Sequence, residues 1–133
     1  MAVKVKPIDL IVVWVGGTVG TAVRVATTPP YAATDFPVAT FVINIIGAGL
    51  LGLLVPVLAR RPQGVGERRL SLLVGTGFLG GFTTYSALAV DTVQLLRAGA
   101  TTPAIAYALG TLVLGATATW LGIVAGRAQG GRG

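Results

Sequence analysis

The chain has 133 residues, of which 53% are hydrophobic and only 11% charged, and its mean hydropathy is +0.83. A soluble domain usually carries about twice that share of charged residues, so the composition favours a membrane protein. Cysteine and histidine are both absent from the sequence, which excludes disulfides, thiolate metal sites and histidine-based catalysis. The net charge of +6 comes from basic residues that flank apolar runs, and it indicates orientation in a bilayer and not nucleic-acid binding.

Four long runs with little or no charge predict four membrane-spanning helices, because a helix needs about 20 mostly apolar residues to cross the hydrocarbon core. The expected helices cover about 8–28, 36–59, 70–96 and 103–126. The first run could be a cleaved signal peptide, since Lys4 and Lys6 precede it, but Asp9 and internal glycines interrupt that pattern. Because the connections are short, we expect residues 1–133 to form one transmembrane domain of the all-α class.

Lysine and arginine are distributed unevenly between the two sides of the predicted bundle. The side with both termini carries Lys4, Lys6, Arg60, Arg61, Arg68, Arg69, Arg127 and Arg132. The other side has Arg97, with Arg24 near the same end of the first helix. Because short loops rich in Lys and Arg stay in the cytoplasm, the sequence predicts a multi-pass protein of the cell membrane with both termini cytoplasmic.

Polar residues interrupt the first two predicted helices, where they are expensive in hydrocarbon and usually functional. In the first helix, Arg24 follows Gly16 and Gly20 at four-residue steps, and it could attract an anion or extend to the membrane interface. In the second helix, Asn44 lies mid-span with Thr40 on the same face. Asn44 could serve an ion pathway, or it could only join two helices by a hydrogen bond.

The third predicted helix contains the stretch GTGFLGGFTTYSAL at 75–88. Its three spaced glycines resemble a dinucleotide-binding fingerprint, but the stretch lies inside a membrane span, and the next acid, Asp91, comes too soon. We interpret it as a broken helix, because Gly80 and Gly81 permit backbone that is not helical. Carbonyls freed at such a break can coordinate a cation.

The fourth predicted helix places Tyr107, Thr111, Gly115 and Thr119 on one face. These hydroxyls could form a polar track, or the threonines could bond to carbonyls of their own helix. Small residues also recur at spacings that let helices approach closely. The pairs are Gly16–Gly20, Gly77–Gly81 and Gly122–Gly126.

Several of these motifs resemble one family in the same helix order. The sequence G-G-F-T-T-Y-S at 80–86 resembles the third-helix signature of the CrcB/Fluc fluoride channels. The motif T-F-V-I-N-I-I-G at 40–47 is similar to that family's second-helix pattern, and G-x-x-x-R at 20–24 to its first-helix pattern. Tyr107 and Thr111 match its fourth-helix polar positions.

The resemblance implies a fluoride-selective channel that lets fluoride leave the cell passively and so reduces its toxicity. It implies an antiparallel dimer of four-helix subunits with two pores, and a structural sodium ion held by the backbone carbonyls of Gly80 and Thr83. The acid near the end of the third helix maps onto Asp91. The fluoride pathway maps onto Arg24, Thr40, Asn44, Tyr85, Ser86, Leu88, Tyr107 and Thr111.

The chain departs from the family at two aromatic positions that are usually both phenylalanine. Here they are Tyr85 and Leu88. Tyrosine keeps a ring with a positive edge that can face an anion, whereas leucine has no such quadrupole. A pore that depends on the second ring would be impaired or lined differently.

Two alternatives compete with a self-sufficient channel. A small multidrug resistance-type exporter also has four short helices, but those proteins use a glutamate in the first helix, and the only glutamate here is Glu67. A structural, non-conducting subunit of a heterodimeric channel is the other. The charge bias opposes insertion in both orientations, and together with Leu88 it predicts a partner that is a second homologous subunit of opposite orientation.

Overall fold

The computed structural model describes residues 6–61 and 64–128, and this part of the chain is helical apart from its connections. The elements are α1 (Pro7–Thr27), α2 (Val38–Ala59), α3 (Val65–Ser71), η1 (Leu72–Leu79), α4 (Gly80–Phe82), α5 (Tyr85–Arg97) and α6 (Thr101–Ala128). The segments from α3 to α5 follow one another as a single interrupted span of 33 residues, Val65–Arg97, called the third span below. The predicted four helices are therefore confirmed, although the third begins at Val65 and not near residue 70.

All four spans are long and apolar enough to cross a membrane. Large apolar side chains cover the outside of the bundle: Trp14 is 71% exposed, and Val113 is 62% exposed. In water such a surface would be unfavourable, but hydrocarbon is a suitable solvent for it. The fold is thus that of a multi-pass membrane protein.

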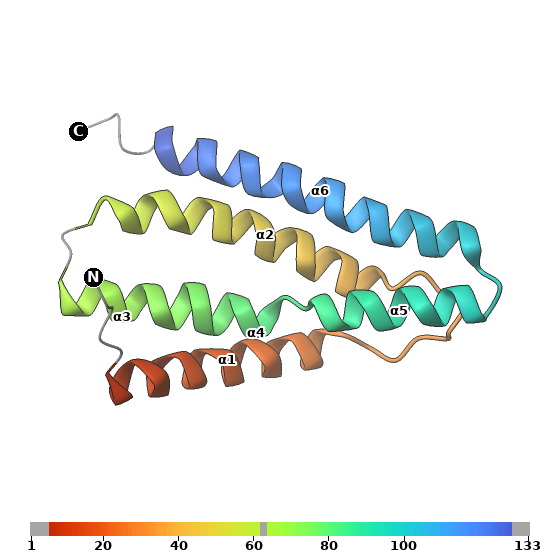
Figure 1. The fold of residues 1–133 in the computed structure, drawn as a ribbon, viewed down its shortest axis with the longest axis horizontal. Helices are drawn as coiled ribbons and strands as arrows, with labels where there is room; N and C mark the ends of the chain where they lie inside the picture. Colours follow the sequence, from red (N-terminus) through yellow and green to blue (C-terminus); the bar gives the residue numbers. More distant parts are fainter. Residues whose placement is uncertain (1–5, 62–63, 129–133) are drawn as a thin grey trace.

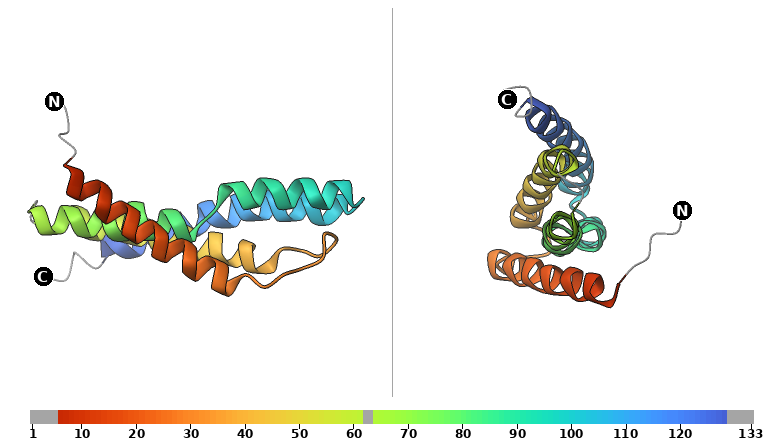
Figure 2. Two further views of the ribbon diagram at one scale, coloured as in Figure 1. Left: turned by 90° about the horizontal axis from the view of Figure 1, so that it is seen from below. Right: turned by 90° about the vertical axis from the view of Figure 1, so that its left-hand side faces the viewer.

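The spans lie side by side in the order α6, α2, third span and α1 (Figure 1). α1 begins and α6 ends at one end of the bundle, which we call the terminal end. The opposite end, where α5 turns into α6, is called the hairpin end. α1 crosses the third span obliquely (Figure 2) and ends beside α4, so Arg24 lies next to the middle of the third span. Lys4 and Arg132, which count in the charge bias, lie outside the described residues.

Glycines allow two helix pairs to approach to backbone contact, as the small-residue spacing predicts. A side chain at Gly77 would lie 2.8 Å from the Val13 carbonyl oxygen of α1, and one at Gly126 would lie 2.8 Å from the Leu53 carbonyl oxygen of α2. Side chains at Gly16, Gly20, Gly81 and Gly122 would also collide with neighbouring backbone. Close backbone approach is a main source of helix association in lipid, so these contacts hold α1 against η1 and α4, and α6 against α2.

The third span is irregular in two places. η1 is a π-helix, in which each turn contains more residues than in an α-helix. The break itself is at Thr83 and Thr84, whose backbones are extended, with ψ of 159° and 118°. Gly80 remains helical, with φ −65° and ψ −34°. The expectation that Gly80 and Gly81 form the non-helical backbone is therefore wrong, and the break lies one turn later.

A buried cluster joins α5 to α6 at the hairpin end. It consists of Leu88, Leu95, Ala104 and Tyr107, with Phe36 and Phe41 packed against it. Phe36 meets Tyr107 edge to face, with ring centroids 5.5 Å apart. Gly99 forms the turn that brings the two helices together, at a φ of 76° that favours glycine.

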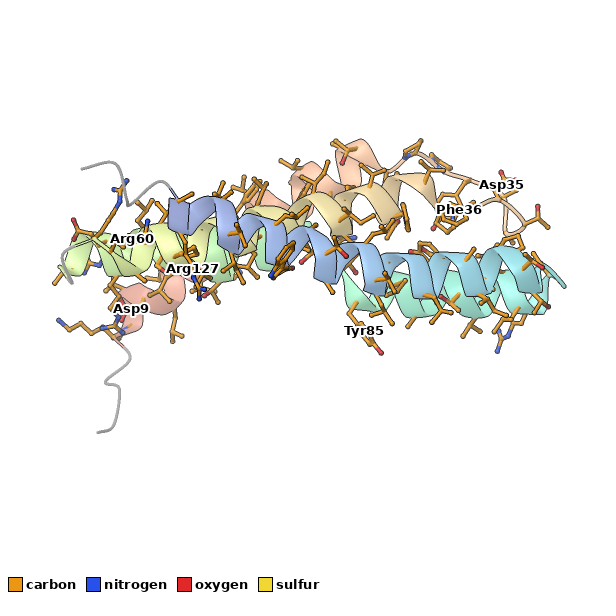
Figure 3. All side chains as sticks on the ribbon, turned by 90° about the horizontal axis from the view of Figure 1, so that it is seen from above. Asp9, Asp35, Phe36, Arg60, Tyr85 and Arg127 are labelled. Carbon is orange, nitrogen blue, oxygen red and sulfur yellow. The ribbon has the colours of Figure 1, made fainter. Side chains whose placement is uncertain are left out.

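Polar side chains fasten the terminal end. Arg60 of α2 donates from Nη1 to the Gly126 carbonyl at 2.8 Å and from Nη2 to the Arg127 carbonyl at 2.7 Å. These bonds satisfy carbonyls near the end of α6 that lack partners in their own helix. Asp9 of α1 is almost fully buried and pairs with Arg68 of α3 at 2.8 Å. Figure 3 shows Asp9, Arg60 and Arg127 at this same end.

Candidate functional site

Asn44 of α2 binds the backbone of the third span at its break. The Thr84 amide donates to Asn44 Oδ1 at 2.8 Å, and Asn44 Nδ2 donates to the Thr84 carbonyl at 3.0 Å. A continuous helix would have used the Thr84 amide to bond the Gly80 carbonyl. The asparagine therefore replaces helical hydrogen bonds that the break removes. Within the described part of the chain, one of its two amide hydrogens has no acceptor and can meet another one.

The break frees carbonyls where the sequence places a cation. The Thr83 amide bonds to the Leu79 carbonyl at 3.0 Å, and the Thr84 amide bonds to Asn44. The Gly80 carbonyl consequently loses the Thr84 amide, and the Thr83 carbonyl loses the Ala87 amide, which bonds to Thr84 Oγ1 instead. Main-chain oxygens suit a hard cation, and no cluster of three His, Cys, Asp or Glu side chains occurs in residues 6–61 and 64–128. The oxygens present fit sodium, whose binding here stays a prediction.

The neighbouring Gly81 carbonyl is used in another way. Arg24 donates to it from Nε at 3.2 Å, and the Thr21 hydroxyl donates at 3.4 Å. α1 therefore caps the end of α4, and Arg24 lies beside the break. Arg24 lies in the last turn of α1, as the sequence predicts, and this end of the helix lies beside α4 at the middle of the third span. The terminal nitrogens of the guanidinium still carry the positive charge that an anion would meet.

A groove of about 460 Å³ runs beside the break. Asn44, Gly80, Thr83, Tyr85 and Thr111 are among the residues that line it, together with Leu88. Tyr85 is 80% exposed and projects outward from the start of α5 (Figure 3). Leu88 is only 8% exposed because it packs in the hairpin-end cluster. The two positions that depart from the family thus have different environments, one open and one buried.

The threonines of α6 bond to their own helix. The Thr111 hydroxyl donates to the Tyr107 carbonyl at 2.6 Å, and the Thr119 hydroxyl donates to the Gly115 carbonyl at 2.9 Å. Tyr107 in turn donates to Asp91 Oδ2 at 3.1 Å. The back-bonding alternative describes this face, so a passing anion would have to break these bonds to recruit the hydroxyls as donors.

Two further pathway candidates lie on either side of the site. Thr40 is 3% exposed and lies in the interior near the hairpin end. Ser86 is exposed, and its Oγ lies 3.2 Å from Thr84 Oγ1. Thr84 Oγ1 also accepts the Ala87 amide at 3.1 Å and so caps α5. Ser86 is therefore part of the helix start that follows the break.

An acidic and phenolic cluster near the hairpin end was only partly foreseen. Asp91 is 6% exposed and accepts the Tyr107 hydroxyl. Tyr31, from the connection between α1 and α2, belongs to the same cluster: burial, and then the adjacent Asp91 carboxylate, raise the pKa of Tyr31 to about 12. The sequence contains no local pattern that places Tyr31 there, because its contact with Asp91 spans 60 residues of chain.

Four spans, a broken third helix and a polar groove beside the break define a small membrane protein whose site lies within the bilayer. The model of the family described as CrcB-like protein, Camphor Resistance (CrcB), matches residues 11–123. The chain belongs to this family.

Three relatives bear names that specify an activity. The fluoride-specific ion channel FluC 2 of Leifsonia xyli subsp. xyli is 48% identical over 128 residues, which cover 93% of this chain and 87% of the relative. The fluoride-specific ion channel FluC 1 of Cutibacterium acnes is 39% identical over 125 residues, 92% of this chain and 87% of the relative. The fluoride-specific ion channel FluC of Mesorhizobium japonicum is 38% identical over 118 residues, which cover 86% of this chain and 93% of the relative.

Proposed function

We propose that this chain is a subunit of a fluoride-selective channel through which fluoride leaves the cytoplasm passively. The observation that carries the proposal is its 48% identity, over 93% of the chain, to a relative named as a fluoride-specific ion channel. Membership of the CrcB-like family argues against the multidrug exporter. The proposed activity needs no catalytic group, no nucleotide and no proton carrier.

The donors around the break support selectivity for a small, strongly hydrated anion. A pore for such an ion must replace its water by hydrogen-bond donors without binding it too tightly. The free amide hydrogen of Asn44 and the ring edge of Tyr85 border the groove, and Arg24 adds positive charge beside it. In this proposal Thr40, Thr111, Tyr107, Ser86 and Leu88 line the remainder of the path.

A structural sodium ion is the proposed cofactor. The Gly80 and Thr83 carbonyls of one subunit would hold it together with the same two carbonyls of a partner. Both residues line the groove, and a Cβ added at Gly80 would meet no atom within 4 Å in this subunit. The open space supports an ion shared across an interface. The charge of the ion would also lower the cost of placing an anion in a low-dielectric interior.

The groove is open along one side, and Tyr85 projects from the subunit beside it. We infer that an antiparallel partner closes this side and completes the pore. The basic residues are concentrated at the terminal end, so the termini are proposed to be cytoplasmic. An antiparallel partner then needs the opposite bias, which favours a second homologous subunit over a second copy of this chain.

Fluoride resistance tests the activity in cells. A bacterial strain without its own fluoride exporters is expected to grow in fluoride medium when it expresses this chain with its partner, and growth with the chain alone would favour a homodimer. Tags at both termini, probed from each side of the membrane, test the orientation. Equal populations in both orientations, with resistance from this chain alone, would refute the heterodimer. Growth in fluoride no better than that of the empty strain, with the chain alone and also with its partner, would refute the channel.

A further inference from the structure

The groove beside the break continues toward the terminal end. A second groove, of about 520 Å³, lies between α2 and the first half of the third span. The two grooves share Leu51, Gly75 and Thr76. Together they reach from Asn44 at the break to Arg68 and Glu67, where the third span begins. The combined groove therefore extends well beyond the residues that surround the break.

One face of the third span lines this groove along its whole length. The lining residues come in adjacent pairs at four-residue steps: Glu67 and Arg68, Ser71 and Leu72, Gly75 and Thr76, Leu79 and Gly80, Thr83 and Thr84. In a regular α-helix each four-residue step rotates the side-chain direction by about 40°. Over the whole series these rotations add up, and the last residues would face the opposite side of the helix. The wider turns of η1 offset that rotation. The π-helix therefore keeps Gly75 and Thr76 facing the groove.

Thr76 differs from most threonines inside the helices. Thr21 and Thr40 also lack a bond to their own helix within the described residues: Thr21 donates to the Gly81 carbonyl of the third span, and Thr40 is only 3% exposed. Thr18, Thr83, Thr92, Thr111, Thr117 and Thr119 each donate to the carbonyl four residues earlier. Within the described residues, Thr76 Oγ1 has no such bond, because the π-helical turn displaces the carbonyl that its hydroxyl would use. Its side chain is exposed in the groove. A hydroxyl at membrane depth without an internal acceptor is available to an ion.

We propose that the π-helical segment η1 presents Thr76 as a hydrogen-bond donor to fluoride on the terminal-end half of the pathway, with Arg68 at its mouth. This inference rests on the proposed function and adds a residue and a route to it. Leu51, Leu54 and Leu72 around it are apolar, and Thr76 adds a hydroxyl donor deeper in the groove than Ser71. Within residues 6–61 and 64–128 only Nη2 of Arg68 has a side-chain partner, Asp9, so its other nitrogens can meet an anion.

Fluoride efflux from liposomes tests the role of Thr76. Thr76→Val keeps the branched shape and removes the donor, and it is expected to slow efflux about tenfold or more, because a hydrogen bond to a charged group is lost. Thr76→Ser keeps the hydroxyl and is expected to restore efflux to near the wild-type rate. Thr117→Val is the matched control, since Thr117 is exposed on α6, lines neither groove and bonds to Val113; it is expected to conduct normally.

The outcomes separate this inference from the proposed function. If wild-type protein conducts and Thr76→Val conducts equally well, the assignment of Thr76 is wrong and the channel remains. If the wild-type chain releases no fluoride either alone or together with a homologous partner chain, both fail. Gel filtration checks that each variant assembles, and Thr76→Ala replaces the valine variant if that one does not. Slow efflux in Thr76→Ser as well as Thr76→Val would show that shape and not the hydroxyl matters, which also overturns the assignment.

Discussion

Asn44 and Thr84 are joined by two hydrogen bonds, one in each direction, although 40 residues separate them in the chain. The Thr84 amide donates to Asn44 Oδ1 at 2.8 Å, and Asn44 Nδ2 donates to the Thr84 carbonyl at 3.0 Å. This two-point contact fixes α2 against the extended backbone at the break. It satisfies main-chain groups that would otherwise lie unpaired at membrane depth, where no water can replace the lost partner.

Replacing Asn44 by alanine is therefore expected to lower stability as well as fluoride flux. The Thr84 amide and carbonyl would both lose their partner, at a cost of about 1–3 kcal/mol for each unsatisfied group. Thermal unfolding in detergent measures the loss. Asn44→Asp is the informative companion, because it keeps an acceptor for the Thr84 amide and replaces the donor by a carboxylate oxygen that carries negative charge. Wild-type unfolding temperatures for Asn44→Ala would show that the contact contributes nothing.

Arg24 is expected to act on the break through the Gly81 carbonyl. Arg24→Gln removes the positive charge and leaves only a neutral amide donor, so fluoride flux should fall by at least about tenfold, an estimate for the loss of a charge-assisted bond. Arg97→Gln serves as the control, because Arg97 is an exposed arginine in the last turn of α5. Equal flux in the two variants would mean that only overall charge matters.

Adjacent glycines at the break should respond differently to alanine. At Gly81 the added methyl group would collide with the backbone of Gly17, whereas at Gly80 it meets nothing within 4 Å in the subunit. Gly81→Ala should therefore disrupt folding of the subunit. Gly80→Ala should leave the isolated subunit folded and weaken sodium-dependent assembly.

Circular dichroism and gel filtration in sodium or in a large organic cation separate these effects for the two glycine variants. Assembly of Gly80→Ala that equals wild type in both salts would argue against an ion shared at this position. Normal folding of Gly81→Ala would argue against the close packing of α1 on α4.

Tyr31 gives the unfolding free energy a specific dependence on alkaline pH. Its pKa rises from 10.0 to about 12 in the folded chain, so the folded state favours the protonated phenol. The contribution is complete below pH 10 and is lost as pH rises from there to about 12. The difference in unfolding temperature between wild type and Tyr31→Phe should therefore change over this interval. Because Tyr31 is 38% exposed, the change should be modest, and parallel pH profiles would contradict it.

The sequence predicted the four spans because their apolar length is a property of each segment alone. It also predicted the close helix contacts, because glycines spaced four residues apart are a property of one helix and let any neighbouring helix approach. The position of the break was predicted one turn too early. Glycine permits an irregular backbone but does not impose one; here Asn44 imposes it from α2 by binding Thr84.

The environment of the site residues depended on tertiary contacts that no local pattern contains. Arg24 lies beside Gly81 because α1 ends at the middle of the third span. Leu88 is buried because α5 turns onto α6 at Gly99 and places it near Tyr107. The π-helix was not predicted either, since its residues also suit an ordinary membrane helix.

Fluoride release from liposomes tests the central claim most directly. Liposomes loaded with fluoride or chloride would carry the purified chain, alone and together with a homologous four-helix chain expressed beside it, and ion-selective electrodes would follow release. We expect rapid release of fluoride and retention of chloride in at least one of the two preparations. Fluoride release no faster than from protein-free liposomes in both preparations, or chloride release as fast as fluoride release, would contradict the account.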